Sequence, residues 1–420
     1  MTLFSIVYVS FGMFKTPSEP IVQGIDDTMY YIWARSLIID RDLDFRNDLE
    51  ISNTVDENAK KNQLSSITKK NLIANKYWIG WAIMNAPVIY LTFISIKSIG
   101  IEANGYEHIF FINIMIFQLC LFLTSLLLSY KILNRFYSAK VSYCAVILTW
   151  LCSPLIYYQT ARFSMVHNQL YLLTVAIIYL SFKIIDRKAK LNTWLLLGLY
   201  SGILIVTRST SIVYLTFTSF VLLNYINTKD IDLQARIRNL SIYVTLLIIP
   251  ILIQLVAWKT IYGSYIYYSY QGESFDFSSP NLWGVLFSNF HGLFNWHPIA
   301  LIGLIGFIFH CIKERSGLSF CISIVSISYI NASWWSYWFG SSFGNRAFEG
   351  IFLFIMLGVA YLITYALKSE RMKYIFTFIS LILITWNTQL LIGWFVQSYE
   401  RESPVTYKER MIFLGNQKNE

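Results

Sequence analysis

The chain has 420 residues, of which 55% are hydrophobic, 17% are aromatic and only 14% are charged, and its formal net charge is +9. So much apolar surface excludes a water-soluble domain of this length, and apolar runs that are continuous instead of alternating exclude a membrane β-barrel. The Lys and Arg residues are spread over short loops and form no single basic stripe, which excludes nucleic acid as a partner.

Apolar runs recur along the chain after about residue 105, and many approach the ~20 residues that a helix needs to cross a ~30 Å hydrocarbon core. The sequence therefore predicts an all-α polytopic membrane protein with about 11 transmembrane helices. The candidate spans are 1–14, 107–131, 141–158, 166–184, 193–208, 210–226, 240–258, 298–312, 317–333, 349–367 and 374–396.

The basic residues predict the orientation of these spans, because short loops rich in Lys and Arg stay on the cytoplasmic side. Such clusters recur after every second span, around Lys131, Lys188, Lys229, Lys313 and Lys368. The intervening loops contain few cations and are predicted to face outside. These features indicate a multi-pass protein of the cytoplasmic (inner) membrane.

The same alternation predicts a large first outer loop, 15–106, if residues 1–14 enter from the cytoplasm. Within it the apolar stretch 78–96 contains Pro87 and two interfacial tryptophans, Trp78 and Trp81. These residues favour a juxtamembrane helix that lies in, or re-enters, the outer leaflet. The alternative is that 78–96 spans the membrane and 15–77 is cytoplasmic.

No stretch has the composition of a separate soluble domain. We therefore expect one integral membrane unit, 1–420, with a second large outer loop at 259–297.

An acidic pair, Asp26-Asp27, begins a predicted helix that runs to Ile39. Two adjacent carboxylates near a lipid boundary repel each other and are poorly solvated, so they persist where a metal, a cation or a proton transfer uses them. Both are therefore candidate catalytic residues. A solvated loop start is the alternative, and the exposed amides of a helix start also favour acids in the first turn. The polar segment 48–76 is predicted to be a mobile loop over this site.

Three arginines fall in the predicted outer loops, where positive charge is disfavoured. Arg162 shares a short turn with His167, and Arg208 and Arg346 lie in two other turns. Arginine at membrane depth requires a partner, and its planar fork suits a phosphate or carboxylate. We expect these four side chains to bind an anionic substrate. Snorkelling to headgroups, or pairing with Glu349, Asp26 or Asp27, is the alternative for each arginine.

The loop 259–297 combines several tyrosines with His291, which is flanked by Gly292 and by polar residues. Aromatic rings and polar groups of this kind form sugar-binding sites, although an interfacial aromatic belt uses the same tyrosines. His291 is therefore a further candidate substrate-binding residue. With His167 and His297 it could also bind a metal, on the weak evidence of widely separated histidines.

Several short motifs in order resemble the GT-C superfamily of polytopic glycosyltransferases, especially the bacterial branch related to lipid A aminoarabinose transferases and protein mannosyltransferases. The resemblance is carried by Asp26-Asp27-Thr28-Met29-Tyr30-Tyr31 with Ala34 to Leu37 and Asp42-Leu43-Asp44, by Tyr77 to Trp81 and Ala86-Pro87, by Ser153 to Tyr158, by Gly198 to Gly202 and Thr207-Arg208, by Leu286 to Ser288 and His291 to Leu293, and by Phe343 to Arg346.

The resemblance implies a polyprenyl-phosphate-linked sugar as donor and an outer-loop Asp that acts as base or helps to bind a metal. It carries the base to Asp26 and a supporting role to Asp27. The second outer loop of the family often has an acidic residue, whereas here that region contains Arg162, His167 and Asn168. No cofactor is required by the sequence, and a divalent metal is left open.

We therefore predict a GT-C-type hexosyl- or pentosyltransferase with its active site on the outer (periplasmic) side. Asp26 would deprotonate or orient the acceptor hydroxyl, and Arg208 and Arg346, with Arg162 as a third candidate, would stabilise the departing phosphate. The expected partners are the lipid-linked donor, a glycan, lipid or protein acceptor, and membrane lipid. The alternatives are a transporter or flippase of a lipid-linked saccharide, and a glycan polymerase.

Overall fold

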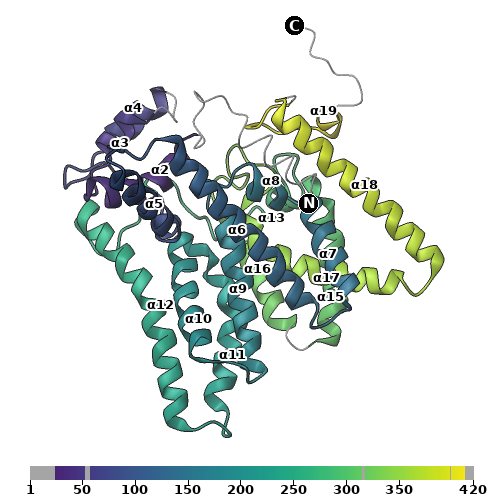
Figure 1. Ribbon diagram of the computed structural model, residues 1–420. Helices are drawn as coiled ribbons and strands as arrows, with labels where there is room; N and C mark the ends of the chain where they lie inside the picture. The colour runs from purple at the N-terminus through teal and green to yellow at the C-terminus, as the bar shows by residue number, and fades with distance from the viewer. Residues whose placement is uncertain (1–23, 53–56, 315–316, 398, 412–420) are drawn as a thin grey trace. The chain divides into compact units, whose positions relative to one another are not determined.

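The computed structural model describes residues 24–52, 57–314, 317–397 and 399–411, and in these ranges every regular element apart from two isolated β-bridges is helical (Figure 1). The α-helices are α2 (Gly24–Arg35), α3 (Arg46–Ile51), α4 (Glu57–Ser65), α5 (Gly80–Ser98), α6 (His108–Leu133), α7 (Ala139–Leu151), α8 (Leu155–Thr160), α9 (His167–Ile185), α10 (Leu191–Thr207), α11 (Thr216–Asn227), α12 (Leu233–Tyr262), α13 (Leu282–Phe287), α14 (Leu293–Trp296), α15 (Pro298–Lys313), α16 (Gly317–Ser333), α17 (Phe352–Ala366), α18 (Glu370–Phe395) and α19 (Tyr407–Arg410). Three short helical turns join them: η1 (Ser36–Asp40), η2 (Ser209–Leu215) and η3 (Arg346–Ile351).

The predicted fold class, an all-α polytopic membrane protein, is confirmed. Among the described residues, six helices are long and apolar enough to cross a membrane: α6, α9, η2 with α11, α12, η3 with α17, and α18. The other predicted spans after residue 100 coincide with the shorter apolar helices α7, α10, α15 and α16. The predicted span 1–14 lies outside the described residues.

One predicted span, 141–158, differs from the structure. Helix α7 ends at Leu151, and α8 begins as a separate short helix at Leu155. Pro154 lies between them, and proline has no backbone N–H and disfavours the helical conformation of the residue before it. Pro154 is therefore a local cause of the break between α7 and α8.

The predicted first outer loop, 15–106, contains more helix in its described residues than the sequence predicts. The predicted helix from Asp26 to Ile39 is present as α2 continued by the π-helical turn η1. The segment 48–76, predicted as a loop, contains most of α3 and all of α4. Helix α4 is rich in Glu, Ala, Lys and Gln, which have high helix propensity and stabilise a short exposed helix. The stretch 78–96 forms α5, which is continuous through Pro87, and its orientation in the membrane stays a prediction.

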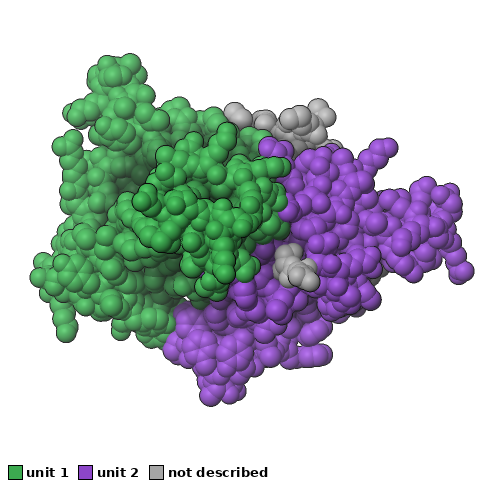
Figure 2. All heavy atoms as spheres, turned by 90° about the horizontal axis from the view of Figure 1, so that it is seen from below, with its two compact units in different colours: residues 1–124, 159–212, 221–273 green, residues 125–158, 213–220, 274–420 purple. Residues whose placement is uncertain are grey.

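The chain divides into two compact units, each built from interleaved segments (Figure 2). Unit 1 comprises residues 1–124, 159–212 and 221–273, and unit 2 comprises residues 125–158, 213–220 and 274–420. In unit 1, α10 packs along α12 and also contacts α9 and α5, while α2 packs on α5. A Cβ at Gly198 in α10 would lie 2.3 Å from the Tyr243 carbonyl oxygen of α12. The missing side chain therefore lets α10 and α12 approach closely.

Unit 2 is organised around α17, which packs against α15 and α7 and is almost completely buried along its first half. The contact with α15 is between two glycines, because a Cβ at Gly306 would lie 2.2 Å from the Gly358 carbonyl oxygen. An aromatic cluster that includes Tyr157, Trp296 and Trp394 packs around Phe343 in the same unit. Small residues and rings together make the core of unit 2.

Candidate functional site

The first turn of α2 holds the acidic pair, and Asp27 is its buried member. The Asp27 side chain is 0% exposed. Its Oδ1 accepts a hydrogen bond from Arg162 Nη2 at 3.0 Å, and its Oδ2 accepts one from Ser164 Oγ at 2.5 Å. Arg162 and Ser164 both lie in the segment between α8 and α9. Asp27 is thus a charged anchor that binds this segment to the start of α2.

Asp26 has a different environment, although it is the next residue in sequence. Its side chain is partly exposed, and its Oδ1 accepts a hydrogen bond from the hydroxyl of Tyr77. Burial of the Tyr77 ring, together with the nearby Asp26 carboxylate, raises the pKa of that hydroxyl well above its usual value. Tyr77 therefore remains a protonated donor to Asp26 at neutral pH. Of the two carboxylates, Asp26 is the one that solvent reaches.

The position of Tyr77 is set by hydrogen bonds to the backbone around it. Trp33 Nε1 donates to the Tyr77 carbonyl oxygen at 3.0 Å, and Asn75 Nδ2 donates to the Met29 carbonyl oxygen at 2.8 Å. The Tyr262 hydroxyl of α12 bonds to both the backbone N and O of Asn75. These bonds hold residues 75–77 against α2, so the Tyr77 hydroxyl meets Asp26 without a flexible linker.

Lys76 places a cation beside this pair. Its Nζ is 5.5 Å from the centroid of the Tyr77 ring, 5.5 Å from that of Tyr270, and 2.5 Å from Glu273 Oε1. The sequence interpretation missed Lys76, because it follows a run of loop lysines from which nothing in the sequence distinguishes it. It also gave no role to Tyr77, which it noted only as part of a longer motif, or to Ser164.

Arg208 caps the C-terminus of α10 in an extended conformation. The preceding residue, Thr207, lies against the start of α5, since a Cβ at Gly80 would be 2.4 Å from the Thr207 backbone nitrogen. Only glycine permits this approach of α10 to α5. Because Gly80 is three residues from Tyr77, Arg208 belongs to the same end of unit 1 as the Asp26–Tyr77 pair.

His167 is the first residue of α9 and is buried, next to a network of side-chain amides. Asn168 Nδ2 donates to Gln118 Oε1 at 2.9 Å, Gln118 Nε2 donates to Asn85 Oδ1 at 3.0 Å, and Gln159 Nε2 donates to Asn168 Oδ1 at 3.2 Å. The network joins α5, α6, α8 and α9. It closes the two ends of segment 159–168 on each other, which supports the Arg162 and Ser164 positions.

The other two predicted site residues lie in unit 2. His291 is fully buried in the left-handed conformation with φ 60°, its Nε2 is 2.8 Å from the Arg401 carbonyl oxygen, and its ring packs on Trp296. Burial lowers the pKa of His291 to about 4, so its imidazole is neutral. Arg346 begins η3 and is partly exposed. A shared site of these two residues with Asp26 stays a prediction.

A metal centre was one expectation for the acidic pair and the histidines. In the ranges that the structure describes, no group of three or more His, Cys, Asp and Glu side chains is placed to hold a metal ion. Both Asp27 oxygens are occupied by Arg162 and Ser164, and His297 Nδ1 is 3.1 Å from Asn387 Oδ1. These residues by themselves do not form a metal centre.

Comparison with known proteins gives one kind of match. No protein-family model matches the chain, and no curated protein matches it in sequence. The structure is similar to the crystal structure of ArnT from Cupriavidus metallidurans in the apo state, with a TM-score of 0.52. The alignment covers 94% of this chain and 70% of that chain, at 14% sequence identity. The similarity shows that this chain has the same fold as that structure, as its sequence motifs predicted.

Proposed function

We propose that this protein is a glycosyltransferase that moves a sugar from a polyprenyl-phosphate donor to an acceptor at the outer face of the cytoplasmic membrane. The fold shared with ArnT supports a membrane glycosyltransferase. The observation that carries the proposal is the division of the acidic pair into a buried, ion-paired Asp27 and a partly exposed Asp26 that meets Tyr77. One carboxylate is available for chemistry, and the other holds it in position.

In the proposed reaction Asp26 is the general base. The acceptor hydroxyl oxygen attacks the anomeric carbon of the donor, its proton passes to the Asp26 carboxylate, and the bond between the anomeric carbon and the phosphate oxygen breaks. The polyprenyl phosphate leaves with the bonding electron pair. A single displacement of this kind inverts the anomeric configuration. Positioned proton acceptors typically contribute about 10²- to 10⁴-fold to such steps.

Tyr77 and Asp27 are positioning residues in this proposal. The Tyr77 hydroxyl donates to one Asp26 oxygen and so orients the carboxylate for proton transfer from the acceptor. The Asp27–Arg162 ion pair fixes the turn of α2 on which Asp26 stands. Arg162 is therefore paired with Asp27, which is the alternative that the sequence analysis gave for this arginine. Direct contact of Arg162 with the substrate stays a prediction.

Negative charge on the departing phosphate requires cations. Arg208 at the end of α10 and Lys76 beside Tyr77 are the candidates in unit 1. An arginine fork can bind two phosphate oxygens at once, whereas lysine acts as a point charge. We therefore assign the main stabilisation of the leaving group to Arg208. Arg346 stays a second candidate for stabilising the departing phosphate, as the sequence predicts.

The test is transfer of a radiolabelled sugar from polyprenyl phosphate in membranes that contain the native chain, Asp26→Asn or Glu50→Gln at matched expression. Glu50 is an exposed acidic residue of α3 and serves as the control for loss of one carboxylate. Transfer by the native chain and the control, but not by Asp26→Asn, supports the proposal. Equal transfer by all three removes Asp26 as the base.

The same assay separates the rival classes. If no chain transfers sugar but the native chain moves labelled lipid-linked saccharide across the bilayer of proteoliposomes, the protein is a flippase. If product forms, the label is partitioned into organic-soluble lipid, precipitated protein and aqueous glycan. The fraction that carries the label identifies the acceptor class, and a ladder of aqueous products would indicate a polymerase.

A further inference from the structure

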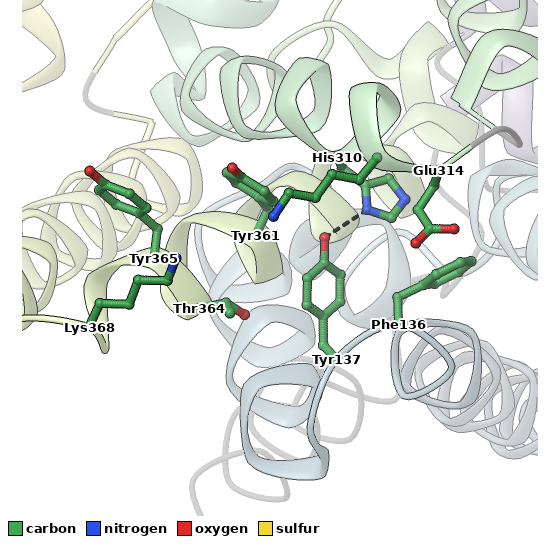
Figure 3. Close-up of a pocket in the computed structure, with 9 residues that line it drawn as sticks. Phe136, Tyr137, His310, Glu314, Tyr361, Thr364, Tyr365 and Lys368 are labelled. Atoms are coloured by element: carbon green, nitrogen blue, oxygen red, sulfur yellow. Dashed lines mark hydrogen bonds between the residues drawn. The ribbon is translucent and has the colours of Figure 1, made fainter.

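Unit 2 contains a cavity of about 180 Å³, far in sequence from the acidic pair (Figure 3). It is lined by the loop between α6 and α7, the end of α15 and the end of α17, through residues that include Tyr137, His310, Lys313, Glu314, Tyr361 and Lys368. The cavity has room for several water molecules. A phosphate group with its neighbouring carbons fits in this space.

The cavity brings together three loops that the sequence predicts on the cytoplasmic side. Lys313 ends α15 and Lys368 follows α17, while Phe136 and Tyr137 belong to the loop before α7. These segments are far apart along the chain. The preference of Lys and Arg for the cytoplasmic side explains why each of these loops is basic. It does not explain why the three loops line one cavity.

The two lysines are held at this cavity by tyrosine rings. Lys313 Nζ lies 5.1 Å from the centroid of the Tyr361 ring, and Lys368 Nζ lies 5.5 Å from that of Tyr365. Tyr361 and Tyr365 are one helical turn apart on α17. Cation–π contacts of this kind restrict the ammonium groups to the cavity and leave their N–H donors available to an anion.

His310 provides a polar group in the wall of the cavity. Its side chain is 2% exposed, and its Nδ1 is 2.7 Å from the Tyr137 hydroxyl. Within the described part of the chain, its Nε2 has no hydrogen-bond partner. When the Tyr137 hydroxyl donates to Nδ1, Nε2 carries the proton and is a donor. His310 lines the cavity together with Lys313 and Lys368, so a buried donor without a partner in this wall indicates that an acceptor is missing.

The charges select the type of anion. Two lysines and one carboxylate, Glu314, give the cavity a formal net charge of +1. A phosphodiester carries one negative charge and balances this, whereas a phosphomonoester dianion leaves an excess negative charge beside Glu314. A phosphodiester is the headgroup linkage of the common anionic phospholipids.

The surface next to the cavity is apolar. Ile312, beside Lys313, is 77% exposed, and Leu367, beside Lys368, is 58% exposed. Cations with adjoining exposed aliphatic side chains mark the level at which a bilayer changes from headgroups to acyl chains. We infer that this cavity binds the phosphodiester headgroup of an anionic phospholipid at the cytoplasmic surface, with the acyl chains on the apolar surface next to it.

The experiment uses the full chain in nanodiscs of phosphatidylcholine, with or without phosphatidylglycerol, and measures the unfolding temperature and the phosphatidylglycerol retained in native mass spectra. The test variant is Lys313→Gln with Lys368→Gln. The control variant is Lys188→Gln with Lys229→Gln, two exposed lysines in basic loops of unit 1. Both variants remove two positive charges, so general attraction to an anionic bilayer falls equally in both.

Phosphatidylglycerol should raise the unfolding temperature of the native chain and the control. The test variant should unfold as the native chain does in phosphatidylcholine, but its affinity for phosphatidylglycerol should be lower by about tenfold or more. Equal losses in the test and control variants would overturn the inference, because they would show only bulk surface attraction.

Two further arms settle the nature of the ligand independently of folding losses. Glu314→Gln removes the repelling carboxylate and should increase phosphatidylglycerol retention, a gain that a misfolded variant does not produce; an unchanged or lower retention would count against the cavity.

If inorganic phosphate stabilises the native chain in phosphatidylcholine discs as fully as phosphatidylglycerol does, and the test variant loses this effect, the ligand is free phosphate and the lipid assignment is wrong.

Discussion

Arg162 and Asp27 form an ion pair across 135 residues of sequence, with Nη2 and Oδ1 3.0 Å apart. Asp27 is fully buried, whereas the Arg162 side chain is 27% exposed. The pair explains how a cation persists in a loop predicted to face outside, where cations are disfavoured. It also explains how two carboxylates can be adjacent here, because Arg162 balances the charge of Asp27 and reduces its repulsion of Asp26.

The ion pair predicts opposite consequences for the two aspartates. Asp27→Asn leaves Arg162 without its buried counter-charge and should lower the free energy of unfolding by about 3 kcal/mol. Asp26→Asn should leave the unfolding temperature within about a degree of the native value, because the side chain is partly exposed. Thermal unfolding in detergent measures both changes, and sugar transfer is measured on the same samples. A stable, inactive Asp27→Asn would contradict the anchoring role.

Tyr77 should affect rate more than stability. Tyr77→Phe keeps the ring contacts with Tyr30 and Tyr270 and removes only the hydrogen bond to Asp26. We expect transfer to slow by roughly tenfold, which corresponds to about 1.4 kcal/mol of lost positioning. Tyr30→Phe is the matched control, since it removes a hydroxyl from the neighbouring ring. If the two variants transfer sugar equally well, the Tyr77 hydroxyl has no role in the reaction.

Gly80 should tolerate no side chain. A Cβ there would lie within 2.5 Å of Thr207 backbone atoms, so Gly80→Ala must push α5 away from the end of α10, with a loss of about 1–3 kcal/mol in stability. The displacement also moves Arg208, and transfer should fall in the fraction that stays folded. Ser98→Ala at the exposed end of α5 is the control. Native-like melting of Gly80→Ala would show that this contact is looser than described.

Asp48 predicts a dependence of stability on pH. Burial raises the pKa of Asp48 from its ordinary value of 3.8 to about 7, against the Arg35 guanidinium 2.7 Å away, which lowers it. The folded protein therefore binds more protons than the unfolded chain between these values. The stabilising contribution is complete below about pH 4 and is lost as the pH rises through about 7.

The measurement is the unfolding temperature of the native chain and of Asp48→Asn between pH 4 and pH 8. The Asp48→Asn variant should show a smaller decrease with rising pH, and Glu50→Gln, on the exposed side of the same helix, should keep the native decrease. A native chain whose stability increases over this range, with the increase removed by Asp48→Asn, would mean that the ion pair with Arg35 outweighs burial.

Much of the fold could be predicted from the sequence because its signals are local. An apolar run long enough to cross the membrane is favourable in a helix whatever lies elsewhere in the chain, and the described spans coincide with such runs. The start of α2 at Asp26-Asp27 is also local, because a helix N-terminus favours acids. The break at Pro154 has a local cause as well, but the apolar residues on both sides concealed it.

Only some members of the candidate site stand out in the sequence. Asp26, Asp27, Arg162 and Arg208 stand out in the sequence because charge is unusual beside apolar helices. Their partners do not stand out: Tyr77 is 51 residues from Asp26, Ser164 is 137 residues from Asp27, and Glu273 is 197 residues from Lys76. Nothing in a local pattern distinguishes these side chains from other tyrosines, serines and acids in loops.

The sequence by itself determined that this protein is helical, that it crosses the membrane repeatedly and which residues carry unusual charge, because hydrophobic transfer and helix starts depend on neighbours along the chain. Only the tertiary structure decided which carboxylate is buried and which is reachable, and that the lysines after α15 and α17 share one cavity. Such differences arise from contacts between distant segments, where the packing of helices, and not the order of residues, sets burial and charge pairing.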